Sequence, residues 1–263
     1  MKKFLTGITV SFNSSKVIFN LINSIEEFLG ESIEWIFVDS GSTDKTTLIL
    51  KNVRNSSRYF FKKNIGFAKG NNYAISMAKG EYIFFCNPDV SFDRYNFEKV
   101  ILELKEKRPL VLVPLLKAKE RTFYFIRPLP SIWNVLFLRW SSGKVKEGEK
   151  FQPAFSAIFL NKKVLDKLKG LDERFFVYFT DVEFFKRFYD SGFRIDDITF
   201  SNSCFYHIGS SVLFLRKFEF LKKFDFARGF FLYFLRYGSL VEKIFSSILF
   251  LLLIMRAFYF YFK

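Results

Sequence analysis

An apolar segment of strand length stops at a short polar turn that carries a carboxylate. Residues 82–86 are apolar, and Asn87, Pro88 and Asp89 follow them directly. A continuous apolar run is typical of a buried parallel strand, and open α/β sheets bind ligands at the carboxyl ends of such strands. Pro88 stiffens the turn, so we expect Asp89 to bind a metal ion with Asn87 beside it. The alternative is a turn that merely ends the strand.

Two earlier strand ends also carry polar side chains. Ser11 lies near the end of the apolar segment 7–12, and Asp39 follows the segment 35–38. The carboxylate of Asp39 can accept a hydrogen bond from the imide N–H of a uracil or thymine ring, while backbone groups after Ser11 can hold the edge of the base. We therefore expect a nucleotide site at the same sheet edge as Asp89. The turn 42–44 is also expected to cap the next helix.

The segment 64–72 adds a third polar group to this edge. Gly66 allows the backbone to approach a ligand, and the amides of Asn64 and Asn71 have the reach to contact a ribose or a phosphate. The segment lacks the Gly-x-Gly-x-x-Gly pattern of dinucleotide-binding folds, and the chain has no P-loop pattern.

Two titratable residues follow in the second half. Asp181 lies near a predicted helix start, where an acid is often only a cap or a partner of the helix dipole. His207 is the sole histidine of the chain, and a lone histidine is more often packed than a ligand. Yet Asp89, one imidazole and the oxygens of a diphosphate would together suit Mg²⁺ or Mn²⁺.

Helical and strand patterns alternate along the chain around these residues. Strands are expected at 7–12, 35–38, 59–62, 82–86, 110–115, 154–160 and 194–206, and helices at 16–29, 45–53, 68–78, 95–107 and 180–190. This rhythm predicts an α/β fold, Rossmann-like, with a mostly parallel central sheet flanked by helices. Residues 117–153, with three prolines and two tryptophans, are expected to form a long loop that covers a substrate.

The C-terminal part differs in composition from residues 1–211. Residues 212–263 form a basic, aromatic-rich segment that ends in the apolar stretch 244–255, Arg256 and an aromatic end. We expect a helical tail that associates with a membrane and lies at the interface more readily than it crosses, because a span needs about 20 apolar residues. The alternatives are a crossing and a helix pair packed on the domain.

Composition limits the possible functions. The formal charge of +15 suits an anionic partner, either nucleic acid, anionic lipid or a diphosphate substrate. The basic residues are spread among 40 phenylalanines without a nucleic-acid reading motif, so we expect no nucleic acid partner. The first segment is predicted to be a strand and not a signal peptide. Cys86 and Cys204, far apart in apolar surroundings, favour a reducing compartment.

Six segments together resemble family 2 inverting glycosyltransferases of the rhamnosyltransferase type. They read, in order, TVSFNS, VDSGSTD, NIGFAKGNN, NPDV, GLDERFF and HIGSS, within residues 6–237. The resemblance implies a GT-A fold, a nucleoside-diphosphate sugar donor and a divalent cation, Mg²⁺ or Mn²⁺. It further implies that Asp39 binds the base, that Asp89 and His207 bind the metal or diphosphate, and that Asp181 is the catalytic base.

Two positions depart from the family pattern. Thr180 stands where the family usually has Glu before the base, which removes a like charge that would raise the pKa of Asp181. Ser156 stands where glycine is common, and we expect it to narrow an acceptor pocket that also includes Asp172. Basic groups such as Arg228 are expected to assist at the diphosphate.

The sequence thus predicts an inverting, metal-dependent glycosyltransferase at the cytoplasmic face of the cell membrane. Its expected donor is dTDP-rhamnose first and a UDP-hexose second, and its expected acceptor is a saccharide on a polyprenyl lipid, in cell-surface polysaccharide synthesis. A catalytically silent, membrane-bound sugar-nucleotide-binding protein remains an alternative. A nucleotidyltransferase is disfavoured because the chain lacks a glycine-rich nucleotide loop.

Overall fold

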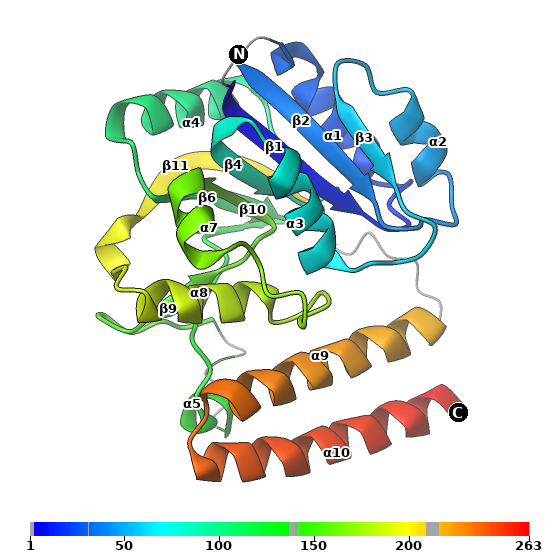
Figure 1. Cartoon of the computed structure of the whole chain (residues 1–263), viewed down its shortest axis with the longest axis vertical. Coiled ribbons are helices and arrows are strands. Elements are labelled where there is room, and N and C mark those ends of the chain that lie inside the picture. The colour runs from blue at the N-terminus through cyan, green and yellow to red at the C-terminus, as the bar shows by residue number, and fades with distance from the viewer. Residues whose placement is uncertain (1–2, 31, 137–139, 141–142, 209–215, 263) are drawn as a thin grey trace.

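The alternation of strands and helices is confirmed in the computed structural model, which describes residues 3–30, 32–136, 140, 143–208 and 216–262 (Figure 1). The first elements are β1 (Lys3–Ser11), α1 (Ile18–Ile25), β2 (Ile33–Asp39), α2 (Thr46–Lys51), β3 (Ser57–Phe60), α3 (Phe67–Met77), β4 (Gly80–Cys86), β5 (Val90–Ser91), α4 (Arg94–Lys107) and β6 (Val111–Ala118). The short strand β5 was not predicted, because two residues show no periodicity.

The second half contains more regular structure than expected. Its elements are β7 (Arg121–Phe123), β8 (Ile126–Pro128), α5 (Ile132–Leu136), β9 (Phe151–Pro153), β10 (Ala157–Asn161), α7 (Lys162–Leu168), α8 (Thr180–Asp190) and β11 (Ile198–His207). The region 117–153 is therefore not a plain loop, since its described residues include the strands β7, β8 and β9 and the helix α5. Helix α7 was missed, whereas the predicted helix 180–190 matches α8.

The central sheet is mixed, which corrects the expectation of a mostly parallel sheet. Its strands run in the order β3-β2-β1-β4-β10-β6-β11-β5, with β7 paired to β6. Strands β1 to β4 are parallel where they pair, and β11 is parallel to β6, but β10 is antiparallel to both β4 and β6. Strand β10 is buried throughout and apolar up to its last residue, Asn161, and burial of this kind reveals a strand but not its direction.

Side chains alternate between two apolar layers along the sheet. In β4, Phe84 belongs to the cluster under α1 and α4, whereas Phe85 belongs to the cluster under α3, α7 and α8. Two glycines permit close strand contacts. A Cβ atom at Gly7 would lie 2.3 Å from the ring of Trp35, and one at Gly80 would lie 2.4 Å from the backbone nitrogen of Thr6.

The chain continues into two long helices, α9 (Arg216–Tyr237) and α10 (Leu240–Phe262), which lie side by side below the sheet domain (Figure 1). One face of α9 packs against the start of α8 in a third cluster with Trp140, Phe179 and Val182. The predicted alternative of a helix pair packed on the domain thus describes this arrangement. The predicted boundary at residues 211–212 lies outside the described residues.

Membrane association of these helices stays a prediction. Among the helices that the structure describes, none combines the length and apolarity needed to cross a bilayer.

Candidate active site

Three parallel strands bring their polar ends to one edge of the sheet. Ser11 at the end of β1 pairs with Asp39 at the end of β2, and the backbone of Ser40 donates to the carbonyl oxygen of Ser11 over 2.8 Å. Strand β4 lies on the other side of β1 and leads into the turn with Asn87 and Asp89. The predicted meeting of these residue types at one edge therefore exists.

Asp39 is almost fully buried, and its carboxylate is held from the following turn. Its two oxygens accept hydrogen bonds from the hydroxyls of Ser42 and Thr47, each over 2.5 Å. The Ser11 hydroxyl is buried against the carbonyl of Val38. Each carboxylate oxygen retains capacity for a second donor, so base recognition by Asp39 stays a prediction.

The segment 64–71 mainly organises the protein itself. The side-chain oxygen of Asn64 accepts from the Ser40 hydroxyl and from the backbone of Gly66, each over 2.9 Å. Gly66 has a φ of +82°, and a Cβ atom there would lie 2.5 Å from the ring of Phe176. Asn71 is buried, and its amide donates to a carbonyl of its own helix, that of Phe67. Gly66 thus serves close contact within the protein, and Asn64 and Asn71 already have protein partners.

The two predicted metal ligands lie together. Asp89 is 6% exposed, and its Oδ2 lies 3.4 Å from Nε2 of His207. Strand β11 carries His207 to this place by pairing with β5 directly after the turn. The hydrogen bond with Asp89 raises the pKa of His207, and its burial opposes this shift.

The residues present fit a divalent cation in part. One carboxylate and one imidazole converge, but among the described residues no cluster of three such ligands forms. An ion bound here would need oxygens from a diphosphate and from water to complete its coordination.

A pocket of about 280 Å³ lies beside this turn, between β8, β9, the start of α8 and α9. Asn87 and Ser156 line it, and the backbone of Asn87 donates to the carbonyl of Ser156 over 2.8 Å. Its walls are largely aromatic, which suits a sugar ring. The aromatic lining residues are Phe67, Phe125, Trp140, Phe155, Tyr178, Phe179 and Phe226.

Asp181 reaches this pocket from the first turn of α8. Its Oδ1 accepts from the backbone of Val182 over 2.9 Å. With the side-chain amide of Gln152 turned so that its nitrogen faces the carboxylate, Gln152 donates to Oδ2 of Asp181 over 3.1 Å. Phe179, just before the helix, has a φ of +67°, a rare conformation for a bulky residue that is typical of functional sites.

Burial gives Asp181 the proton affinity of a base. Protein surrounds the carboxyl, although part of the residue reaches the pocket, and this burial raises its pKa to about 6. The positive charge of Arg127 opposes the rise. The Thr180 hydroxyl donates to the carbonyl of Val177, and none of the influences that set the pKa of Asp181 comes from Thr180. The like charge lost at position 180 is thus not needed to raise the pKa.

Two polar residues of the pocket, Arg127 and Gln152, were not among the predicted site residues. Arg127 lies over the rings of Phe125 and Trp140 with its guanidinium 5.4 and 5.5 Å from their centres, and Gln152 lies in β9. Both come from the segment expected to be a loop. Only its abundance of proline and tryptophan marked it as unusual.

Two other predicted site residues lie elsewhere. Asp172 is not among the pocket-lining residues, because its carboxylate pairs with Arg174 and Arg236 at 2.5 and 2.6 Å. Burial opposes ionisation of Asp172, but these partners hold its pKa at about 2. Arg228 lies on α9, where its charge partly opposes the rise that burial causes in the pKa of Asp225. The roles given to Asp172 and Arg228 therefore have no support from these contacts.

Residues 7–169 match the family model Glycosyl transferase family 2, so the chain belongs to that family. Membership of family 2, predicted from the six segments, is thereby confirmed, whereas the inverting mechanism and the rhamnosyltransferase type stay predictions. The architecture is that of a GT-A-like α/β fold with a mixed sheet between helices.

Two curated relatives are similar over part of the chain. The minor teichoic acid biosynthesis protein GgaB of Bacillus subtilis is 32% identical over 41% of this chain and 13% of its own length. An uncharacterised glycosyltransferase of Rickettsia typhi, RT0329, is 29% identical over 44% of this chain and 38% of its own. The chain thus spans well under half the length of both relatives.

Solved structures share the fold. TarS of S. aureus, residues 1–349 in complex with UDP, has a TM-score of 0.59 at 19% identity and covers 92% of this chain and 68% of its own. The mannosyltransferase PcManGT of Pyrobaculum calidifontis, in complex with GDP-Man and Mn²⁺, has a TM-score of 0.60 at 14% identity and covers 99% and 74%.

Proposed function

We propose that the protein is an inverting glycosyltransferase that uses a nucleoside-diphosphate sugar. The observation that carries this proposal is the position of Asp181, a carboxyl with a pKa raised to about 6, in an aromatic pocket beside the turn of Asn87 and Asp89. The hydroxyl oxygen of an acceptor attacks the anomeric carbon while Asp181 takes its proton. The bond from that carbon to the diphosphate oxygen breaks, and the electron pair leaves with the nucleotide.

Asp89 and His207 are the residues that would hold Mg²⁺ or Mn²⁺ in this proposal. A bound cation would neutralise negative charge on the departing diphosphate. The Mn²⁺ in the complex of PcManGT supports this assignment by likeness of fold. Asn87 lines the pocket two positions before Asp89, and we assign it to orient the diphosphate toward Asp181.

Asp39, with Ser11 beside it, is assigned to the base of the nucleotide. The neighbouring structures hold UDP, UDP-GlcNAc and GDP-Man. We retain a UDP or dTDP sugar as the donor, because an acid at the end of β2 suits the imide N–H of uracil and thymine. Rhamnose as the transferred sugar rests on the resemblance of the six sequence segments.

The acceptor in this proposal is a saccharide on a polyprenyl lipid at the cytoplasmic face of the membrane, used for a surface polysaccharide. Its support is an apolar face of α10 whose residues are each between 55% and 74% exposed and recur every three or four positions. They are Leu240, Val241, Ile244, Ile248, Leu251, Leu252 and Met255. The net charge of +15 suits the anionic surface of a bilayer. The teichoic acid relative supports a polymer of the cell surface.

A nucleotide panel tests the donor site. We expect UDP or dTDP to raise the melting temperature in the presence of Mn²⁺, with GDP and CMP as comparison ligands, because a ligand that binds the folded state stabilises it. Asp89→Ala should abolish the part of the rise in melting temperature that depends on Mn²⁺. Asp181→Asn should retain the shift but lose sugar transfer. No shift with any nucleotide would refute the assignment of the donor site, and transfer by Asp181→Asn would refute the base.

Vesicle flotation tests the membrane face separately. The full chain should float with vesicles of phosphatidylglycerol, and Ile248→Ser combined with Leu252→Ser should weaken this binding. Ser247→Ala serves as a control in the same helix, because Ser247 is half-buried and is not one of the exposed apolar residues. A chain that ends before Leu240 and still floats at high salt would contradict anchoring through α10.

A further inference from the structure

Helix α9 contacts the segment that carries Asp181 at three places. The segment runs from residue 177 through the first turn of α8 and lines the pocket, which α9 also borders through Phe226. Along α9, Asp225 contacts this segment first, then Gly229 and finally Arg236 and Tyr237. The three contacts use different physical interactions and follow each other along the helix.

The first contact holds the backbone ahead of α8. Oδ2 of Asp225 accepts hydrogen bonds from the backbone N–H groups of Val177 and Tyr178, over 3.1 and 3.0 Å. Burial raises the pKa of Asp225, and these two hydrogen bonds oppose the rise. A partly buried carboxylate with two backbone donors fixes the position of the chain that it binds.

The second contact is a close approach of backbones. A Cβ atom at Gly229 would lie 2.9 Å from the carbonyl oxygen of Tyr178 and 3.1 Å from Cβ of Phe179. Phe179 is the residue with the positive φ, two positions before Asp181. The absence of a side chain at position 229 therefore lets α9 rest against the strained residue that starts α8.

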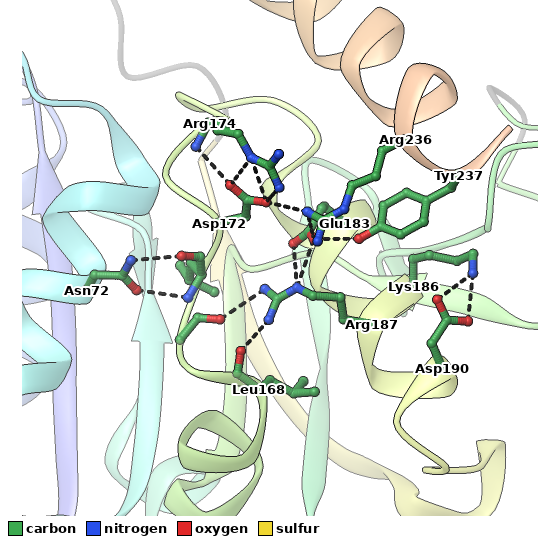
Figure 2. A network of polar contacts seen from close by, with 12 residues as sticks. Asn72, Leu168, Asp172, Arg174, Glu183, Lys186, Arg187, Asp190, Arg236 and Tyr237 are labelled. Carbon is green, nitrogen blue, oxygen red and sulfur yellow. Dashed lines mark hydrogen bonds and ion pairs between the residues drawn. The ribbon is translucent and has the colours of Figure 1, made fainter. Parts of the chain in front are cut away.

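The third contact is an ionic cluster around the buried Glu183, shown in Figure 2. Glu183 is fully buried, two positions after Asp181, and its Oε1 accepts from Nη1 of Arg236 over 3.2 Å and from the Tyr237 hydroxyl over 2.8 Å. Arg187 of α8 binds both oxygens of Glu183. Arg236 also binds Asp172, so the end of α9 is joined to α8 and to the loop before it.

We propose that α9 positions the catalytic base, with Asp225, Arg236 and Tyr237 as positioning residues that act through the backbone on either side of Asp181. This inference rests on the role of Asp181 in the proposed function. Helix α9 then serves the chemistry itself. An error of about 1 Å in the place of a catalytic group costs about 100-fold in rate, so small movements of α9 matter.

The experiment compares Arg236→Ala and Tyr237→Phe with two matched controls in the full-length protein. Arg174, like Arg236, pairs with Asp172, so Arg174→Ala removes one ion pair of Asp172 but leaves every hydrogen bond to Glu183 in place. Leu235→Ala shortens an exposed side chain of the same helix turn. Hydrogen exchange of the amides of residues 177–186 is measured without any ligand. Rates are measured with UDP-GlcNAc, GDP-mannose and dTDP-rhamnose, using whichever donor the wild type turns over.

Faster exchange in residues 177–186 is expected for Arg236→Ala and, to a smaller degree, for Tyr237→Phe, but for neither control. The kcat should fall about 10- to 100-fold for Arg236→Ala while KM for the donor stays within about twofold, because the donor is bound elsewhere. If exchange and kcat match the wild type in both variants, α9 does not position the base. A KM effect without a kcat effect also overturns the proposal.

Failure of the proposed function gives a different result. If the wild type turns over none of the three donors and no nucleotide raises its melting temperature, the assigned reaction is wrong, while the exchange measurement still decides whether α9 holds the segment. Tyr237→Phe guards against misfolding, since it removes a single hydroxyl from the Glu183 cluster. If both variants exchange faster in residues 177–186 but keep the kcat of the wild type, the contacts of α9 have a structural role only, and the proposal is overturned.

Discussion

Replacing Asp181 by asparagine is expected to stabilise the protein while it abolishes transfer. The pKa of Asp181 is about 6 in the folded chain, because burial disfavours the charged form, and its ordinary value is 3.8. The folded state therefore holds the proton more tightly than the unfolded state. Its contribution to stability is fully present below pH 3.8 and is lost as the pH rises through 6.

The size of the effect follows from the shift. A difference of about two pKa units corresponds to about 3 kcal/mol in the free energy of unfolding once the group is ionised. Asparagine removes this cost and retains an oxygen for the backbone N–H of Val182. Its new amide nitrogen can meet the carbonyl oxygen of Gln152 if that amide rotates. We therefore expect a gain of up to about 3 kcal/mol at pH 7.5.

Urea unfolding of both proteins between pH 4 and pH 8 measures the difference. The two free-energy curves should diverge between pH 4 and pH 6 and run parallel above pH 7. Asp44→Asn is a control of opposite sign. Burial opposes ionisation of Asp44, but hydrogen bonds from Ser15 and Thr46 lower its pKa, so its replacement should destabilise the protein at neutral pH. A constant difference between Asp181→Asn and the wild type across this range would refute a buried base.

Three further changes test the site. Arg127→Met should move the acidic limb of the pH profile of kcat/KM to higher pH, because the charge of Arg127 opposes the rise in the pKa of Asp181. An unchanged acidic limb would exclude this influence. His207→Ala should raise the Mn²⁺ concentration needed for half-maximal nucleotide binding about tenfold or more, because a metal ligand is lost. Calorimetry measures this concentration, and an unchanged value would contradict the role of His207 as a ligand. Gly66→Ala should destabilise the fold by about 1–3 kcal/mol in thermal unfolding, because its Cβ meets Phe176 and its φ is positive; equal stability would contradict the close contact.

The sequence predicted the strands and helices near the site better than it predicted how these elements pair and pack with one another. The apolar run before Asn87 and the acids at two strand ends carry local signals, and the structure brings their elements to one sheet edge. The antiparallel direction of β10 was missed, since a fully buried strand looks alike in either direction. Such local patterns locate a residue on an element without identifying what that element touches.

The pocket was harder to predict because its residues meet only through tertiary contacts. Gln152 and Arg127 lie in short strands without strong periodicity, and their meeting with Asp181 depends on how β8 and β9 pack on α8. Asn71 is an error of the other kind, a residue that was predicted to contact a ligand but has a partner within the protein. Its amide looked available for a ligand, but helix geometry offers it a carbonyl four residues earlier.

The glycines of the sheet have a consequence for folding. Strand β4 is apolar toward both layers, so a shift of one residue would exchange one phenylalanine for another and cost little burial. Gly80 fits against the backbone of Thr6, where any Cβ would overlap, and Gly7 fits under the ring of Trp35. Shifting β1 or β4 would bring a side chain into these two places. The absence of side chains at Gly7 and Gly80 thus specifies the strand register more than the hydrophobic pattern does. The same register aligns Ser11, Asp39 and the turn that carries Asp89.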